Sequence, residues 1–167
     1  MPMSANNGTA EVGKQRSKVG IPASETPHEM IDRLEALLRQ VPQVKMEPVH
    51  RFTPKLYTRE LTMPAGTLLT SKIHKTEHQY IVSKGIVQVW LDGRRERIVA
   101  PYHGITQPGT RRVLYVEEET IWTTCHPTVT TDLVALEEEL IEPREVALEL
   151  TSGMAQDIED VLRKELT

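Results

Sequence analysis

The first pattern of hydrophobic positions along the chain is helical. Apolar residues recur every three or four positions at Met30, Ile31, Leu34, Leu37, Leu38 and Val41. Thr26 and Glu29 have the spacing of a capping box, and Pro27 suits the first helical position. Pro42 ends the run. The pattern therefore predicts one amphipathic helix over residues 26–42.

A second pattern begins near residue 55, where β-branched and alternating stretches replace the helical spacing. Candidate strands cover 55–62, 67–74, 78–83, 86–91, 94–100, 112–116 and 120–126. Asp92-Gly93 is a strong signal for a two-residue hairpin, and Pro108-Gly109 marks another turn. Short strands at this spacing predict a sandwich or small barrel over residues 50–128.

The two ends of the chain differ from this central part. Residues 1–25 are rich in small and polar residues, and we interpret them as a flexible arm. Residues 129–167 predict a helical tail, with Thr131-Asp132 as the cap of one helix and a last helix over 154–166.

Charge and composition exclude several classes of protein. The chain has 24 acidic and 20 basic residues, so it lacks the cationic excess typical of nucleic-acid coats and polybasic membrane binders. No run of about twenty apolar residues is present, and we expect no membrane span. Cys125 is the single cysteine, which excludes an internal disulfide framework. We expect a soluble protein of the cytoplasm.

Between the predicted strands, one set of spacings resembles a known family. Gly66 is followed at fixed intervals by Lys72, His74, His78 and Gly85. This series resembles the first signature of the cupin superfamily, with Lys72 in place of the first histidine and His78 in place of the glutamate. Residues 107–112 resemble the second signature, with Arg112 where a ligand histidine would stand.

The resemblance implies an all-β core, a cupin-type double-stranded β-helix or small jelly-roll barrel, with an N-terminal helix and C-terminal helices. More loosely, residues 55–141 resemble small cupin-like proteins encoded in bacteriophage genomes, through the phrases HKTEH, PGTRR and WTTCHPT. That likeness implies a phage-type accessory protein, located in the host cytoplasm or in the virion.

Strand parity indicates which side chains share a face. Lys72 and His74 lie two residues apart, as do His78 and Tyr80, whereas Arg111 and Arg112 point to opposite faces. Under the cupin register, the barrel mouth would hold Lys72, His74, His78 and Arg112, with Tyr80 beside them.

These residues favour an anion over a metal ion. His74 and His78 are the candidate metal ligands, but Lys72 and Arg112 would each oppose a dication by about 8 kcal/mol at 4 Å and an effective dielectric near 20. His103 and His126 are further imidazoles, but no spacing brings either to the site. A lysine and an arginine instead suit a carboxylate or phosphate. We therefore expect a non-catalytic protein that binds a small anionic molecule and no cofactor.

Two alternatives remain open at this point. One is a structural, virion or scaffold protein with a filled barrel, in which Lys72 points outwards and the histidines are hydrogen-bonded. The other is a metal-free isomerase or epimerase, with His74 or His78 as the general base, which would need an orienting carboxylate and a nearby acid such as Tyr80 or Tyr115. Flanking helices and strand edges also predict a homo-oligomer.

Overall fold

The computed structural model describes residues 26–143. The predicted arm over 1–25 and the predicted last helix over 154–166 lie outside these residues. Two helices flank a β core: α1 (Pro27–Leu38) and α2 (Leu133–Leu140). The strands are β1 (Val49–Thr53), β2 (Leu56–Met63), β3 (Leu68–Thr70), β4 (His78–Leu91), β5 (Arg94–Val99), β6 (Tyr102–Thr106) and β7 (Val113–Pro127).

The capping box predicted for the first helix is present. The Thr26 hydroxyl accepts a hydrogen bond from the Glu29 backbone at 3.3 Å, and the Glu29 carboxylate accepts one from the Thr26 backbone at 2.7 Å. The helix ends at Leu38, before the predicted limit at residue 42. The Gln43 side chain donates to the carbonyl oxygens of Leu38 and Val41, which satisfies backbone groups that a longer helix would have used.

Two long strands organise the barrel. β4 and β7 pair with each other in antiparallel fashion along most of their lengths. The first half of β4 also pairs with β6 and its second half with β5. The first part of β7 pairs with β3 and the remainder with β2, which carries β1 at its outer edge. Each long strand therefore belongs to both halves of the sheet.

The bend between the two halves lies at irregular pairing in the middle of β4. The register shifts between Val82 and Val87, and Gly85 has φ +87°. A Cβ at Gly85 would lie 2.2 Å from the Glu119 carbonyl oxygen, so a side chain has no room there. The bulge lets the sheet fold over on itself, and a buried cluster fills the space between the halves: Leu61, Met63, Tyr80, Val82, Val87, Val89, Ile98, Leu114 and Val116.

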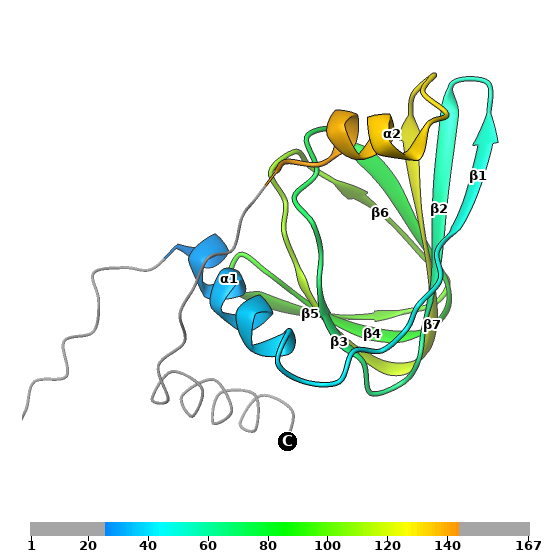
Figure 1. The fold of residues 1–167 in the computed structure, drawn as a ribbon. Helices are drawn as coiled ribbons and strands as arrows, with labels where there is room; N and C mark the ends of the chain where they lie inside the picture. Colours follow the sequence, from blue (N-terminus) through cyan, green and yellow to red (C-terminus); the bar gives the residue numbers. More distant parts are fainter. Residues whose placement is uncertain (1–25, 144–167) are drawn as a thin grey trace, which may run out of the picture.

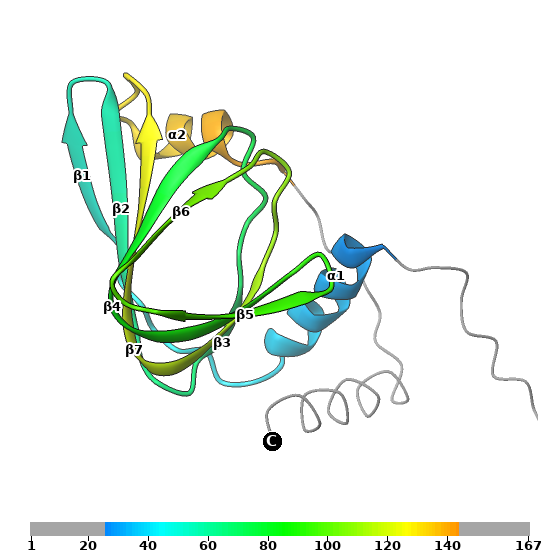
Figure 2. The same ribbon diagram turned by 180° about the vertical axis from the view of Figure 1, so that it is seen from behind.

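The helices occupy different places on this barrel (Figures 1 and 2). α2 lies at the end of the barrel where β2 and β7 meet, and Leu136 and Leu140 pack there against Tyr57. α1 lies outside the barrel, against β3. The predicted class, an all-β core with a helix at each end, is confirmed. The N-cap predicted at residues 131–132 is confirmed at Asp132, whose carboxylate accepts from the Ala135 backbone.

Several strand predictions were incomplete. The segments at 78–83 and 86–91 are one continuous strand, as are those at 112–116 and 120–126. The strand predicted over 67–74 is limited to Leu68–Thr70. β1 and β6 were not predicted, because most residues of β1 are exposed and β6 is only five residues long.

Candidate metal centre

A cavity of about 560 Å³ lies at the α2 end of the barrel. Its wall is formed by side chains from β1, β2, β3, β4, β6, β7 and α2 and from the segments before β1, β4 and β7. Its apolar part includes Leu61, Met63, Leu69, Leu114 and Trp122. Its polar part includes three histidines, His74, His78 and His126, together with two arginines, Arg59 and Arg112. Polar and apolar groups therefore meet in one hollow at this end of the barrel, next to the buried cluster.

The three histidines come from different parts of the fold. His78 is the first residue of β4, and His126 lies near the end of β7. His74 precedes β4, where its backbone forms a β-bridge with Ile141. Ring centroids lie 4.2 Å apart for His74 and His78, and 4.2 Å apart for His78 and His126. One ring nitrogen from each lies within 4.8 Å of the others.

Their environment keeps these imidazoles neutral. Burial, with the neighbouring histidines, lowers the pKa of His74 to about 3. Burial likewise lowers the pKa of His126 to about 4 and also lowers the pKa of His78. A neutral imidazole retains the lone pair that a metal ion needs.

The hydrogen bonding of the three rings leaves nitrogens available for coordination. His78 Nδ1 lies 3.2 Å from the Thr76 carbonyl oxygen, so it is the protonated nitrogen and Nε2 keeps the lone pair. The Nδ1 atoms of His74 and His126 are buried and have no hydrogen-bond partner within residues 26–143. Leaving such atoms unpaired costs free energy, and a hydrogen bond from a ligand histidine to a carbonyl is a usual arrangement around metals.

The donor set therefore fits a metal ion. Three neutral imidazoles suit transition ions such as Zn²⁺, Co²⁺, Ni²⁺ or Fe²⁺ better than the oxygen-seeking Ca²⁺ or Mg²⁺. Three protein ligands leave at least one coordination position for another molecule, as in catalytic or ligand-binding centres. His74 and His78, the metal ligands named from the sequence, are joined here by His126.

Lys72 lies at the edge of this cavity, but its charge is already paired. Its ammonium group forms an ion pair with Glu137 of α2, and both side chains are more than half exposed. Lys72 thus opposes a bound dication less than an unpaired lysine would. Its role in ligand binding stays a prediction.

Arg112 is buried, and its guanidinium lies 5.3 Å from the centre of the Tyr80 ring. The Tyr80 ring in turn stacks on Trp122, with centroids 4.4 Å apart and planes inclined by 6°. Burial raises the pKa of Tyr80 to about 12. Tyr80 therefore belongs to the buried core and supports Arg112 through a cation–π contact.

Tyr57 packs beside the third histidine. Its ring centroid lies 5.9 Å from that of His126, and its hydroxyl is 2.7 Å from His50 Nδ1. Burial raises the pKa of Tyr57. This contact fixes one side of the His126 ring, because the tyrosine is held in place by its own hydrogen bond.

Sequence reasoning named His126 but did not place it in the site. The register of β7 against its neighbours decides its position: Tyr57 pairs with His126, and Gln79 pairs with Cys125. The parity of β7 was a usable signal, since Trp122, Thr124 and His126 share a face. Parity alone could not show that this face meets His78.

Comparison with known proteins gives matches among solved structures only. No family model and no curated protein matches the chain. A cupin-2 domain-containing protein from Shewanella frigidimarina matches with TM-score 0.43 and 12% identity, covering 57% of this chain and 92% of its own. The Cnp3 cupin domain of Schizosaccharomyces pombe gives TM-score 0.43 and 16% identity, with 60% and 71% covered. KdgF from Halomonas sp. gives TM-score 0.44 and 15% identity, with 52% and 86% covered.

Two of these matches are cupins by description, the family that the glycine framework resembles. Their low identities and TM-scores transfer no function and no site residue to this chain. The candidate centre is therefore argued from its own residues. Among residues 26–143, no helix has the length and apolarity needed to cross a membrane.

Proposed function

We propose that the protein binds a divalent transition-metal ion through His74, His78 and His126 and uses the open coordination position to bind a small molecule in the barrel cavity. The convergence of three ring nitrogens within 4.8 Å carries this proposal. Within the described part of the chain, the Nδ1 atoms of His74 and His126 have no hydrogen-bond partner. They support the proposal, because a buried polar cluster without partners costs free energy.

This proposal differs from the sequence-based expectation of no cofactor. That expectation counted two histidines against two free cations. Three histidines now converge, and the Lys72 charge is paired with Glu137. The third histidine therefore shifts the balance towards metal binding, even though two cations, Arg59 and Arg112, lie on the cavity wall.

The metal ion would polarise a bound ligand as a Lewis acid. The protein supplies the remaining features of the site. His78 is oriented by the Thr76 carbonyl, and Tyr57 packs against His126. The apolar wall limits water around the ligand. These features are sufficient for ligand binding and do not require a catalytic residue.

The metal-free isomerase alternative has less support. A histidine base of this kind was expected to need an orienting carboxylate and a nearby acid. Within residues 26–143, the polar neighbour of His78 is a backbone carbonyl. Of the two tyrosines considered as the acid, Tyr80 lies in the core and Tyr115 is not among the residues that line the cavity. The scaffold alternative, including a phage accessory role and a homo-oligomer, rests on surfaces outside this cavity and stays a separate prediction.

Calorimetric titration of chelator-treated full-length protein with Zn²⁺ tests the proposal. We expect one ion per chain. We also expect His126→Ala to weaken binding by at least about tenfold, within the cost of losing one ligand or its support. His103→Ala is the matched control, since His103 is an exposed histidine on neighbouring β6. Absence of stoichiometric binding, or equal loss in both variants, would contradict the proposal.

A further inference from the structure

The charges around the cavity point to the kind of molecule that it binds. Arg59, Lys72 and Arg112 are the arginine and lysine side chains on its wall, and Glu137 is its one carboxylate among the described residues. Lys72 and Glu137 pair with each other. Two guanidinium groups therefore face the cavity without a compensating carboxylate in its wall.

Arg112 provides the more informative of these charges. The residue is 7% exposed. Within residues 26–143, no carboxylate lies at ion-pair distance from its guanidinium, whereas its neighbour Arg111 contacts both Asp32 and Glu35. The Tyr80 ring is the contact that holds the Arg112 guanidinium. Asp92 and Glu96 attract the Arg112 charge without contacting it, so a ligand anion in contact with the guanidinium would offset more of its desolvation cost.

Arg59, an exposed residue of β2, adds a second positive group to the cavity wall. It lies on the same face of β2 as Tyr57 and Leu61, and its register partner on β7 is Thr124. Thr124 also pairs with Tyr80 of β4. Arg59 and the Tyr80–Arg112 pair are thus attached to strands on either side of one β7 position, close to the histidine cluster.

A metal ion at the three histidines would increase the positive charge further, because neutral imidazoles do not cancel it. Cations near a dication oppose its binding. An anion placed between the ion and the arginines removes this opposition and uses all three as partners. Arginine can bind both oxygens of one carboxylate.

The remaining wall indicates the body of the ligand. Beyond the charged groups, the cavity is lined by aliphatic and aromatic side chains, namely Leu61, Met63, Leu69, Leu114 and Trp122. Its volume of about 560 Å³ lies within the usual range for small-molecule sites. An inorganic anion or a sugar would leave this apolar wall without a matching surface.

We propose that the cavity binds a small organic carboxylate, whose carboxylate group lies between the metal ion and Arg112 and whose apolar body contacts the wall. This inference rests on the proposed metal centre. Metal and carboxylate then bind with positive coupling: each raises the affinity for the other by the same factor.

The test measures Co²⁺ affinity of the full-length protein by calorimetry with benzoate, benzamide, acetate or no addition. Benzamide has the shape of benzoate without its charge, and acetate has the charge without the apolar ring. We expect saturating benzoate to tighten Co²⁺ binding by about tenfold, which is within the usual range of coupling between sites. Benzamide should have no effect, and acetate should have a smaller effect than benzoate.

Two variants identify the arginine responsible. Arg112→Met should abolish the benzoate effect, and Arg112→Lys should restore part of it, because lysine keeps the charge without the planar fork. Arg94→Met is the matched control, since it removes an exposed arginine from the β4–β5 hairpin. Near-ultraviolet circular dichroism checks that each variant is folded, and the comparison of the three additives with no addition on unaltered protein needs no variant.

The outcomes separate this inference from the proposed function. Co²⁺ binding that benzoate does not change overturns the carboxylate site and leaves the metal centre standing. An equal effect of acetate and benzoate overturns the inference that an apolar body of the ligand contacts the cavity wall. Failure of Co²⁺ to bind at all, with or without benzoate, overturns the metal centre and the coupling together.

Discussion

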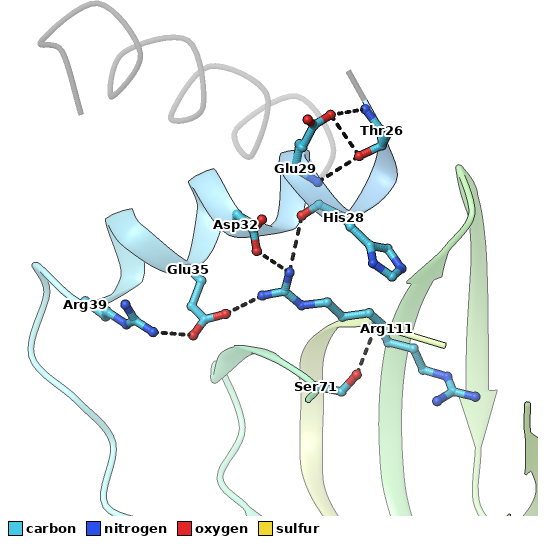
Figure 3. Close-up of polar contacts among 9 residues, drawn as sticks. Thr26, His28, Glu29, Asp32, Glu35, Arg39, Ser71 and Arg111 are labelled. Carbon is cyan, nitrogen blue, oxygen red and sulfur yellow. Dashed lines mark hydrogen bonds and ion pairs between the residues drawn. The ribbon is translucent and has the colours of Figure 1, made fainter. Parts of the chain in front are cut away.

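Arg111 and Arg112 are adjacent in sequence and both buried, yet their surroundings differ completely. Arg111 points outwards from the barrel to α1, where it contacts Asp32 at 2.5 Å, Glu35 and the His28 carbonyl oxygen (Figure 3). Arg112 lies on the cavity side, over the Tyr80 ring. Two equally buried charges can therefore have different roles. The role of each depends on whether a carboxylate of the protein contacts it.

The structural role of Arg111 follows from its partners. Its side chain is 3% exposed, and its two carboxylate partners lie on successive turns of α1. Glu35 is further held by Arg39, at 2.7 Å. These contacts fasten the helix to the barrel, so Arg111 needs no ligand to complete it. Within the described residues Arg112 has no such set of partners, so its guanidinium is available to bind a ligand.

The largest effect is expected when Arg111 is changed to methionine. The change removes the buried cation that Asp32 and Glu35 share, and breaking a buried ion pair in this way costs about 3 kcal/mol. We expect the free energy of unfolding to fall by that amount in urea denaturation. Arg39→Met, which removes only the exposed outer arginine of the group, is the control. A loss below about 1 kcal/mol in Arg111→Met would show that the helix is held in another way.

A pH titration of stability tests the histidine side of the cavity in metal-free protein. The pKa values of His74 and His126 are lowered to about 3 and about 4, against 6.5 in an unfolded chain. Between these limits the unfolded state binds more protons than the folded state, so stability falls as the pH falls below 6.5 and levels off near the folded values.

The variant His126→Gln should reduce this dependence of stability on pH. Urea denaturation at several pH values between 7 and 4 measures it, with His103→Gln as the control. An unchanged slope in His126→Gln would mean that His126 is not the buried neutral group described here.

The support beneath Arg112 can be tested at Gly104. A Cβ at this position would lie 2.3 Å from Tyr80 Cζ, so alanine must displace the ring that carries the guanidinium. We expect Gly104→Ala to lower the free energy of unfolding by about 2 kcal/mol, as overpacking usually does. Gly93→Ala is a comparison variant that strains the backbone without a steric clash, because Gly93 has a positive φ and open space around it. Thermal or urea denaturation measures both, and an unchanged Gly104→Ala would contradict the close packing.

The smallest effect is expected at Lys72. Its ion pair with Glu137 is exposed, and pairs of this kind contribute less than about 1 kcal/mol. We expect Lys72→Ala to change the free energy of unfolding by less than that, and any effect to diminish in high salt. A loss comparable to that of Arg111→Met would show that this pair, too, is structural.

The sequence predicted the elements better than their contacts. The Thr26 capping box and the Asp92-Gly93 hairpin depend on neighbouring residues, and both are present. β-Strand parity correctly separated Arg111 from Arg112 and put His78 and Tyr80 on one buried face. These features could be predicted because each depends on residues that are close together in the sequence.

The residues of the candidate site could be predicted from local sequence patterns only in part. His126 reaches His78 through the pairing of β4 with β7, which no local pattern encodes. The pairing of Lys72 with Glu137 depends on where α2 lies over the barrel end. The sequence left His126 outside the site and Lys72 without a counter-charge. Both expectations weighed against a metal ion.

X-ray absorption at the zinc edge of the Zn²⁺-loaded protein is the most direct test of the central claim. We expect three imidazole nitrogens bound at about 2.0–2.1 Å and a spectrum that loses one imidazole in His126→Ala but keeps all three in His103→Ala. A zinc environment made mainly of oxygen, or one unaffected by His126→Ala, would contradict it.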